Sequence, residues 1–325
     1  MLSPELPHPP AAKVRSANLI PLVVILGPTG VGKSEVAIQL AERFNGEIVS
    51  ADSRLFYRGM DIGTAKPTVE ERLRVPHHLI DVADPDNIWN LGIFQREANR
   101  AIKEIYTKQH LPFLVGGTGQ FVHSIIEGWS VPAVEPNPLL RGVLTQWTEN
   151  IGPVELHKKL ALLDPQAAIA IDPSNIRRTI RALEVILTTG IRFSDQKKRG
   201  DIFYDQLLLG LICPRSELYH RIDERISRML DSGFVEEVQR LLDRGYSPEL
   251  PTLTAIGYGE IVATIQGKIS MEEAIVYMKR RTRVFVRRQA NWFKENDPQI
   301  HWFQTGKTTL VDMQETINQW WLSIN

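Results

Sequence analysis

Residues 27 to 34, with the sequence GPTGVGKS, follow the pattern G-x-x-x-x-G-K-[ST], which wraps a polyphosphate. Glycines in such a loop let backbone N–H groups point inward, and the start of the following helix adds its positive dipole end. Lys33 supplies a point charge, and the hydroxyl of Ser34 can hold Mg²⁺. The alternative is an ordinary turn between a strand and a helix. The expected phosphate-binding residues are Gly27, Pro28, Thr29, Gly30, Val31, Gly32, Lys33 and Ser34.

A loop of this kind leaves open which bond of its ligand breaks. A kinase or nucleoside triphosphatase moves the terminal phosphoryl group, whereas a transferase that uses a diphosphate ester releases diphosphate as the leaving group. Triphosphatases of this class usually hold Mg²⁺ with an aspartate that ends a second apolar strand. Here the apolar stretch 111–117 ends in glycines, and Asp81 is the only comparable residue. The pattern therefore tilts away from routine ATP hydrolysis.

The loop must be positioned by the elements around it, and these alternate between strands and helices. Apolar, β-branched runs predict buried strands, and residues 94–110 have helical spacing. The expected strands span residues 19–27, 47–53, 78–82, 111–117 and 206–214. This alternation predicts an α/β fold in which helices cover both faces of a parallel sheet.

The middle of the chain departs from this alternation. From about residue 136 to 199 the pattern is helical, as in 176–190, where Gly190 suits a helix end. Because the strand at 206–214 resumes the series, we expect a helical insertion in the α/β core. The expected divisions are a disordered, Pro-rich tail at 1–18, a first core part at 19–135, the insertion at 136–200, and a second core part at 201–325 with basic C-terminal helices.

Composition narrows the class of protein. The 325 residues are 43% apolar and 23% charged with a formal net charge of zero, so only local clusters could indicate a nucleic-acid partner. The single cysteine, Cys213, excludes a disulfide within the chain and fits a reducing cytoplasm. No apolar run reaches the roughly 18 residues that a membrane span needs. The eight histidines lack the spacing of metal ligands. We expect a cytoplasmic protein without a membrane partner.

Five blocks of sequence together resemble the tRNA dimethylallyltransferases, also called tRNA isopentenyltransferases. They are GPTGVGKS at 27–34, SADSRLFYRGMDIGTAKP at 50–67, PHHLIDVADP at 76–85, LVGGTGQF at 114–121 and AIGYGE at 255–260. The resemblance runs from about Ile20 to Trp302. It implies a P-loop, nucleoside-kinase-like core with an all-helical insertion, and Mg²⁺ as cofactor. The implied reaction transfers the dimethylallyl group of dimethylallyl diphosphate to N6 of the tRNA adenosine beside the anticodon. We expect a monomer.

That reaction requires a base, because the lone pair of an exocyclic adenine amine is delocalised into the ring. Asp52 follows a predicted strand, at the edge where open α/β sheets place ligands. The resemblance makes Asp52 the general base; the alternative is an aspartate that caps a turn. The N–H groups from Thr29 to Ser34, with Lys33, would stabilise the leaving diphosphate. The resemblance also implies an arginine near the diphosphate, and among Arg221, Arg225 and Arg228 we favour Arg225.

On the RNA side, the target base must leave its stack, and positive charge must grip the backbone. Residues 279–294 carry seven cations and no acid, which favours RNA contact over ion pairs with acidic segments such as 81–87. Arg280, Arg283 and Arg287 share one helix face there. The resemblance implies tRNA contacts at Asp52, Ser53, Arg54, Leu55, Thr118, Arg141, Arg177, Arg178, Arg181, Gly257 and Tyr258. Tyr258 would stack on a base or belong to the core.

Three alternatives stay open from the sequence. A small-molecule kinase of the P-loop type would use ATP and release ADP, and a non-catalytic RNA-binding protein would need no base at Asp52. Transfer of the isopentenyl group to a free adenosine phosphate is a nearer rival, which the basic clusters disfavour.

Overall fold

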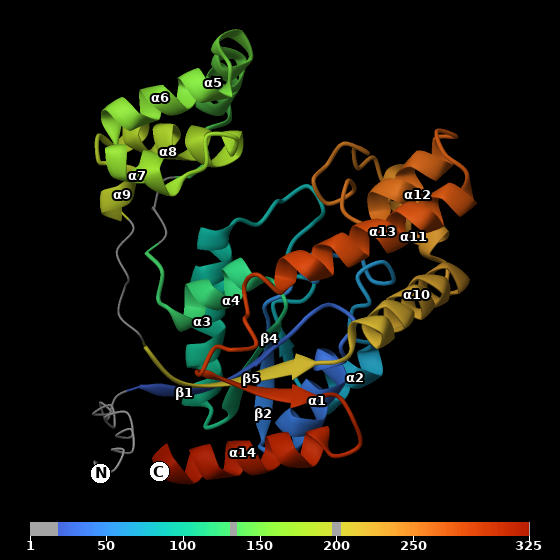
Figure 1. Cartoon of the computed structure of the whole chain (residues 1–325). Coiled ribbons are helices and arrows are strands. Elements are labelled where there is room, and N and C mark those ends of the chain that lie inside the picture. Colours follow the sequence, from blue (N-terminus) through green and yellow to red (C-terminus); the bar gives the residue numbers. More distant parts are fainter. Residues whose placement is uncertain (1–18, 131–134, 197–202, 325) are drawn as a thin grey trace, which may run out of the picture.

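A computed structural model describes residues 19–130, 135–196 and 203–324. Its centre is a six-stranded parallel sheet in the order β3-β2-β4-β1-β5-β6 (Figure 1). The strands are β1 (Ile20–Leu26), β2 (Gly46–Ser50), β3 (His77–His78), β4 (Leu111–Gly116), β5 (Tyr204–Ile212) and β6 (Ile300–Gln304). The prediction of an α/β fold with a parallel sheet is confirmed.

Helices cover both faces of this sheet. On one side α1 (Lys33–Arg43) packs with α14 (Thr309–Ile324), and on the other α3 (Leu91–Thr107) packs with α4 (Gly119–Ile126) (Figure 1). The strands between them are apolar almost throughout because both of their faces are buried: β4 is buried along its whole length, and β1 at every position after Ile20. Helix α3 buries one stripe, and its buried residues are Phe94, Ala98, Ala101, Ile102 and Ile105.

Five helices lie between α4 and β5 and form a separate lobe (Figure 1). They are α5 (Pro138–Ile151), α6 (Pro153–Leu163), α7 (Pro165–Ala170), α8 (Ile176–Thr189) and α9 (Phe193–Gln196). Leu144, Leu156, Leu160 and Leu183 belong to an apolar core of this lobe alone. Helix α8 ends at Gly190, whose φ of 71° is the left-handed conformation that suits a helix end.

A second group of helices stands beyond the carboxyl ends of the strands (Figure 1). It consists of α10 (Arg215–Asp231), α11 (Phe234–Asp243), α12 (Tyr258–Ile265) and α13 (Met271–Gln289). The segment from residue 51 to α2 (Val69–Arg74) runs along the same edge. This edge of the sheet is where ligands bind in open α/β folds.

The structure corrects some of the expected elements. The strand predicted at 78–82 is wrong: β3 stops at His78, and Leu79 and Asp81 have φ values of 62° and 55°, which a strand does not allow. Strand β6 and helix α14 were not predicted at all. The predicted disordered tail, 1–18, lies outside the described residues. Within the described ranges, no helix has the length and apolar character that crossing a bilayer requires.

Candidate active site

The loop from Gly27 to Gly32 joins β1 to α1 and has the backbone that a phosphate cradle needs. Gly27, Gly30 and Gly32 have φ values of 148°, 88° and 103°, a region that favours glycine. A Cβ on Gly27 would also lie 2.5 Å from the carbonyl oxygen of Leu211 in β5. Since Gly32 supplies no side-chain cap, the first N–H groups of α1 can serve a bound anion.

The ammonium of Lys33 closes this loop. Its Nζ donates to the carbonyl oxygen of Pro28 at 2.9 Å. Burial lowers the pKa of Lys33 to about 8, and the negative charge of nearby Asp52 opposes part of that effect. Near neutral pH the ammonium is therefore mostly charged, but it loses its proton only slightly above neutral pH.

Two cavities meet at the carboxyl edge of the sheet. We call the first, of about 360 Å³, the P-loop cavity, because Gly30, Gly32, Lys33 and Ser34 line it. We call the second, of about 400 Å³, the helix cavity, because residues of α10, α11 and α13 form much of its wall. Thr29, Asp52, Thr64 and Arg225 line both cavities. A ligand in one cavity therefore borders a ligand in the other at these four side chains.

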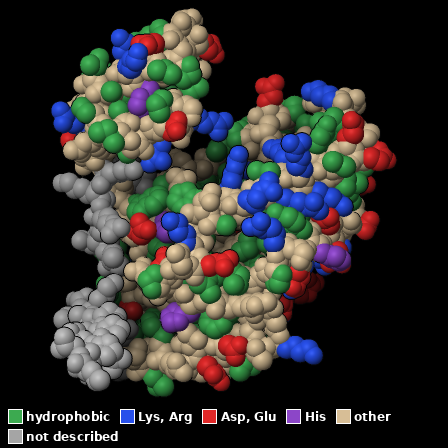
Figure 2. Space-filling model, viewed as in Figure 1, with side chains coloured by type: hydrophobic (Ala, Val, Ile, Leu, Met, Phe, Trp, Pro, Cys, Tyr) green, Lys and Arg blue, Asp and Glu red, His purple; other side chains and the backbone are tan. Residues whose placement is uncertain are grey.

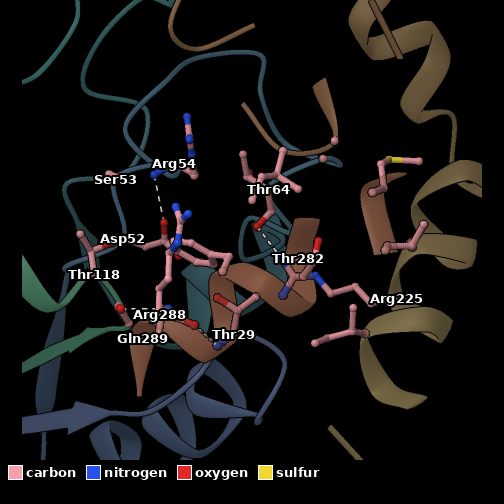
Figure 3. Close-up of a pocket in the computed structure, with 18 of the residues that line it drawn as sticks. Thr29, Asp52, Ser53, Arg54, Thr64, Thr118, Arg225, Thr282, Arg288 and Gln289 are labelled. Atoms are coloured by element: carbon pink, nitrogen blue, oxygen red, sulfur yellow. Dashed lines mark hydrogen bonds between the residues drawn. The ribbon is translucent and has the colours of Figure 1, made fainter. Parts of the chain in front are cut away.

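Asp52 lies just beyond β2, at this junction (Figure 3). Its Oδ1 accepts the N–H of Arg54 at 3.0 Å, so the carboxylate does cap a turn. Its charge also opposes the lowering of the pKa values of Lys33 and Arg225. The turn fixes the side chain through one oxygen, and the carboxylate as a whole faces the cavities. The capping and the basic role are thus compatible.

Helix α10 turns three arginines toward the P-loop cavity: Arg221, Arg225 and Arg228. Arg225 donates to the carbonyl oxygen of Thr64 at 2.9 Å, and burial lowers the pKa of its guanidinium. Arg221 donates to the carbonyl oxygen of Val31 at 3.2 Å and pairs with Glu217. Of the three, Arg225 is the one that lines both cavities.

The residues expected to contact tRNA divide into two groups. Ser53, Arg54, Thr118 and Gly257 line the helix cavity, and Leu55 lines the P-loop cavity. The four arginines lie in the separate lobe on α5 and α8. The structure therefore brings the first group to the site and leaves the second in another part of the molecule.

Two of those arginines already have a partner. Arg141 makes a bidentate pair with the fully buried carboxylate of Glu184, at 2.9 and 2.8 Å, and Arg181 reaches the same carboxylate at 2.6 Å. Arg177 and Arg178, at the start of α8, are exposed. Of the four, Arg177 and Arg178 present the most accessible charge to a partner.

Tyr258 belongs to the core, which is one of the two alternatives that the sequence left open for it. It is 1% exposed, and its ring meets Phe234 edge-on with centroids 5.0 Å apart. Its hydroxyl donates to Glu237 Oε1 at 2.6 Å. The same carboxylate accepts three backbone N–H groups, those of Asp61, Ile62 and Gly63. Tyr258 and Glu237 therefore hold the segment that leads to Thr64.

The basic stretch 279–294 covers the later part of α13 and the residues after it. Lys and Arg side chains gather over this side of the molecule (Figure 2). Lys279, Arg280, Arg283 and Arg287 line a hollow on α13. The acidic partners on this helix come from its neighbours, not from residues 81–87. Arg283 pairs with Asp223 of α10 at 2.7 Å, and Arg281 with Glu260 of α12 at 2.7 Å. Asp81 pairs instead with Lys66 and Arg72.

Several residues of the helix cavity could not be anticipated from the sequence. Thr64, Met229, Met278, Thr282, Phe285, Arg288, Gln289 and Trp292 line it. Five of them lie in the basic stretch 279–294, for which the sequence predicted RNA contact but no place in the wall of a cavity. The structure explains the glycine at position 119, because a Cβ there would lie 2.1 Å from Trp292 Cγ.

A magnesium ion fits this site through few protein ligands. Among the described residues no group of three or more His, Cys, Asp or Glu side chains is arranged to hold a metal. Ser34 lines the P-loop cavity beside Lys33. Mg²⁺ commonly keeps several waters and binds through one or two protein groups together with phosphate oxygens, so Ser34 and a bound diphosphate would suffice.

Two known proteins that are similar to this chain carry the same name. A protein from Thermomicrobium roseum named tRNA dimethylallyltransferase is 50% identical over 283 residues, 87% of this chain and 86% of that protein. Another of the same name, from a Roseiflexus species, is 45% identical over 304 residues, 94% of this chain and 99% of that protein.

Solved structures that resemble this one carry names of the same kind. The full-length tRNA isopentenylpyrophosphate transferase of Bacillus halodurans is 39% identical with a TM-score of 0.68, over 92% of this chain and 96% of that one. A eukaryotic dimethylallyltransferase acting on tRNA is 28% identical with a TM-score of 0.78, over 92% of this chain and 77% of that one. A model of the IPP transferase family matches residues 55–296. The resemblance of the five sequence blocks is thereby confirmed, and the chain belongs to the IPP transferase family.

Proposed function

We propose that this protein transfers a dimethylallyl group from dimethylallyl diphosphate to N6 of the adenosine beside the anticodon of tRNA. The observation that carries the proposal is the meeting of two cavities at Asp52, Thr29, Thr64 and Arg225. A phosphate cradle lies on one side of these residues and a wider, largely apolar cavity on the other. Relatives that share up to half of the sequence carry the name of this activity.

In the proposed reaction the bond from the allylic carbon to oxygen breaks, and a bond from that carbon to N6 forms. Diphosphate leaves into the P-loop cavity, where the N–H groups of residues 30–34 and the charges of Lys33 and Arg225 offset its growing negative charge. Mg²⁺, held by Ser34, would supply further charge to the diphosphate. Asp52 takes the proton that N6 loses.

The adenine enters from the helix cavity, turned out of its stack. Ser53, Arg54, Thr118 and Gly257 line that cavity and are proposed to contact the flipped nucleotide and its neighbours. Leu55, which is mostly buried, supports the same turn from the P-loop side. A base that enters here meets Asp52 and the allylic carbon on the side away from the diphosphate.

The helical lobe, α5 to α9, is proposed to grip the tRNA backbone at a distance from the reaction. Arg177 and Arg178 offer exposed cations for phosphate contacts. Arg141 and Arg181 contribute by their anchorage on Glu184, which orders that surface. We propose that the enzyme works as a monomer in the cytoplasm, where its substrates occur together.

A kinase would need an aspartate to hold Mg²⁺, and Asp81 was the candidate for that role. Its carboxylate is instead paired with Lys66 and Arg72. One experiment separates it from the proposal. The protein is incubated with labelled dimethylallyl diphosphate, Mg²⁺ and either unmodified tRNA or AMP, and in parallel with ATP. Label in tRNA supports the proposal. Label only in AMP, or release of ADP without any label transfer, contradicts it.

The role of Asp52 is tested by Asp52→Asn. An amide oxygen can still accept the N–H of Arg54, so the turn is kept while the base is removed. We expect turnover to fall about 10²- to 10⁴-fold, with tRNA affinity unchanged within twofold. Asp84→Asn, at an exposed aspartate paired with Arg58, is the matched control. Wild-type turnover in Asp52→Asn would remove Asp52 from the role of base.

A further inference from the structure

Gln289, the last residue of α13, crosses from the basic helix into the phosphate cradle (Figure 3). Its Oε1 accepts the N–H of Thr29 at 2.9 Å, and its Nε2 donates to the carbonyl oxygen of Gly117 at 2.9 Å. One carboxamide thus joins three segments that are far apart in the sequence: the P-loop, the turn after β4, and α13.

The bridge is built into the interior. Gln289 is 5% exposed, and a buried carboxamide is tolerated when both of its ends are hydrogen-bonded. Space for it depends on Gly117, where a Cβ would lie 2.5 Å from Gln289 Nε2 and 3.4 Å from Lys33 Nζ. The carboxamide therefore lies against the same glycine as the Lys33 ammonium, at the wall of the cradle.

We propose that Gln289 is a positioning residue that holds the P-loop in its diphosphate-binding shape and fastens it to the RNA-facing helix. The proposal rests on the proposed function for the ligand, a diphosphate ester. The carboxamide uses the Thr29 N–H, so the diphosphate is bound by the N–H groups that follow it, with Lys33 and Arg225. Losing the bridge frees the loop to adopt other shapes, and affinity falls with the fraction of molecules that keep the binding shape.

A second consequence is a link between the two substrates. The outer face of α13 carries Arg280 and Arg287, and Gln289 at the end of this helix accepts a hydrogen bond from the P-loop. If RNA on that face steadies the helix, diphosphate binds more tightly to the RNA-bound protein, and RNA binds more tightly to the diphosphate-bound protein by the same factor. Gln289 is the contact through which this coupling passes.

The test measures binding of inorganic diphosphate with Mg²⁺ by calorimetry, without turnover. Loss of two net hydrogen bonds corresponds to about 5- to 150-fold in an equilibrium constant. We expect Gln289→Ala to weaken diphosphate binding by a factor in that range, while tRNA affinity stays within twofold. Gln289→Glu keeps an acceptor for Thr29 but loses the donor to Gly117 and adds a negative charge, so it should weaken diphosphate further.

The matched control is Gln95→Ala. Gln95 is a half-buried carboxamide that also bridges two backbone positions, the carbonyl oxygens of Ser124 and Trp129. It lies outside the lining of both cavities as the structure describes them. It should leave diphosphate affinity unchanged. Equal losses in Gln95→Ala and Gln289→Ala, or diphosphate binding that is unchanged or tighter in Gln289→Ala, would overturn the proposal.

Amide hydrogen exchange supplies a readout that needs no ligand. The peptide 27–34 should exchange faster in Gln289→Ala than in the wild type, and at the wild-type rate in Gln95→Ala. Unchanged exchange of that peptide in Gln289→Ala contradicts the positioning role. If exchange is faster in Gln289→Ala but the wild type transfers no label to tRNA, the proposed function is refuted and the role of Gln289 still stands.

Discussion

Replacing Glu237 by glutamine should loosen the edge of the active site. The carboxylate is 3% exposed and accepts four hydrogen bonds: from the N–H groups of Asp61, Ile62 and Gly63 at 2.9, 2.7 and 3.1 Å, and from Tyr258 at 2.6 Å. The segment that it holds continues into Thr64, whose carbonyl oxygen accepts Arg225. Glu237 thus supports Arg225, an arginine of the proposed active site, through the backbone.

The magnitude follows from the donors. A glutamine amide has one acceptor oxygen, which can keep the bonds from Asp61 and Ile62, and the hydroxyl of Tyr258 can rotate to accept from the new NH₂. The N–H of Gly63 then faces a donor and stays unpaired, at a cost of about 1–3 kcal/mol. The retained bonds also lose their charge assistance, roughly half their strength. Relief of burying a charge offsets part of this loss. We expect a net destabilisation of about 2–4 kcal/mol.

Thermal unfolding measures this loss, and Tm should fall by roughly 3–6 °C in a chain of 325 residues. Tyr258→Phe removes one bond and creates no clash, so it should cost less, about 1.5–3 kcal/mol. Glu236→Gln, at the exposed neighbour on the same helix, is the control. It should cost less than about 1 kcal/mol, through the helix dipole. A Tm of Glu237→Gln that matches Glu236→Gln, or a larger loss in Tyr258→Phe, would refute the reasoning.

Three further predictions concern charge and space at the site. Affinity for inorganic diphosphate should fall by up to roughly sixfold from pH 8 to 9, because Lys33 loses its proton above a pKa of about 8. Lys33→Arg should flatten that part of the profile, and a flat wild-type profile would contradict the prediction. Gly119→Ala should displace Trp292 from the helix cavity and slow transfer, whereas Gly142→Ala, where a Cβ meets nothing within 4 Å, should not; equal rates would contradict this. Arg287→Ala should reduce the steepness of log tRNA affinity against log salt concentration by about 0.7–0.9. An unchanged slope would exclude a phosphate contact at Arg287.

Local sequence patterns predicted most of the helices and strands, because apolar runs and the positions of glycines are both properties of neighbouring residues. Apolar runs such as residues 20–26 can be buried on two faces only as inner parallel strands, and glycines at 27, 30 and 32 permit a loop that few other residues allow. The stretch 78–82 misled this reasoning, since Leu79 and Ile80 are buried by a turn with positive φ values and not by a strand. Strand β6 lacked a signal: its burial is mixed, and it joins the sheet only at an edge, beside β5.

The sequence by itself determined the phosphate cradle, the α/β class and, through its five blocks, the family, since these depend on neighbouring residues or on order along the chain. Only the tertiary structure decided that Asp52 and Arg225 share the junction of two cavities, that Tyr258 is core, and that Gln289 holds Thr29 across 260 residues. The physical reason is that burial and hydrogen-bond partners depend on which helices pack beyond the sheet edge. No spacing along the chain carries that information.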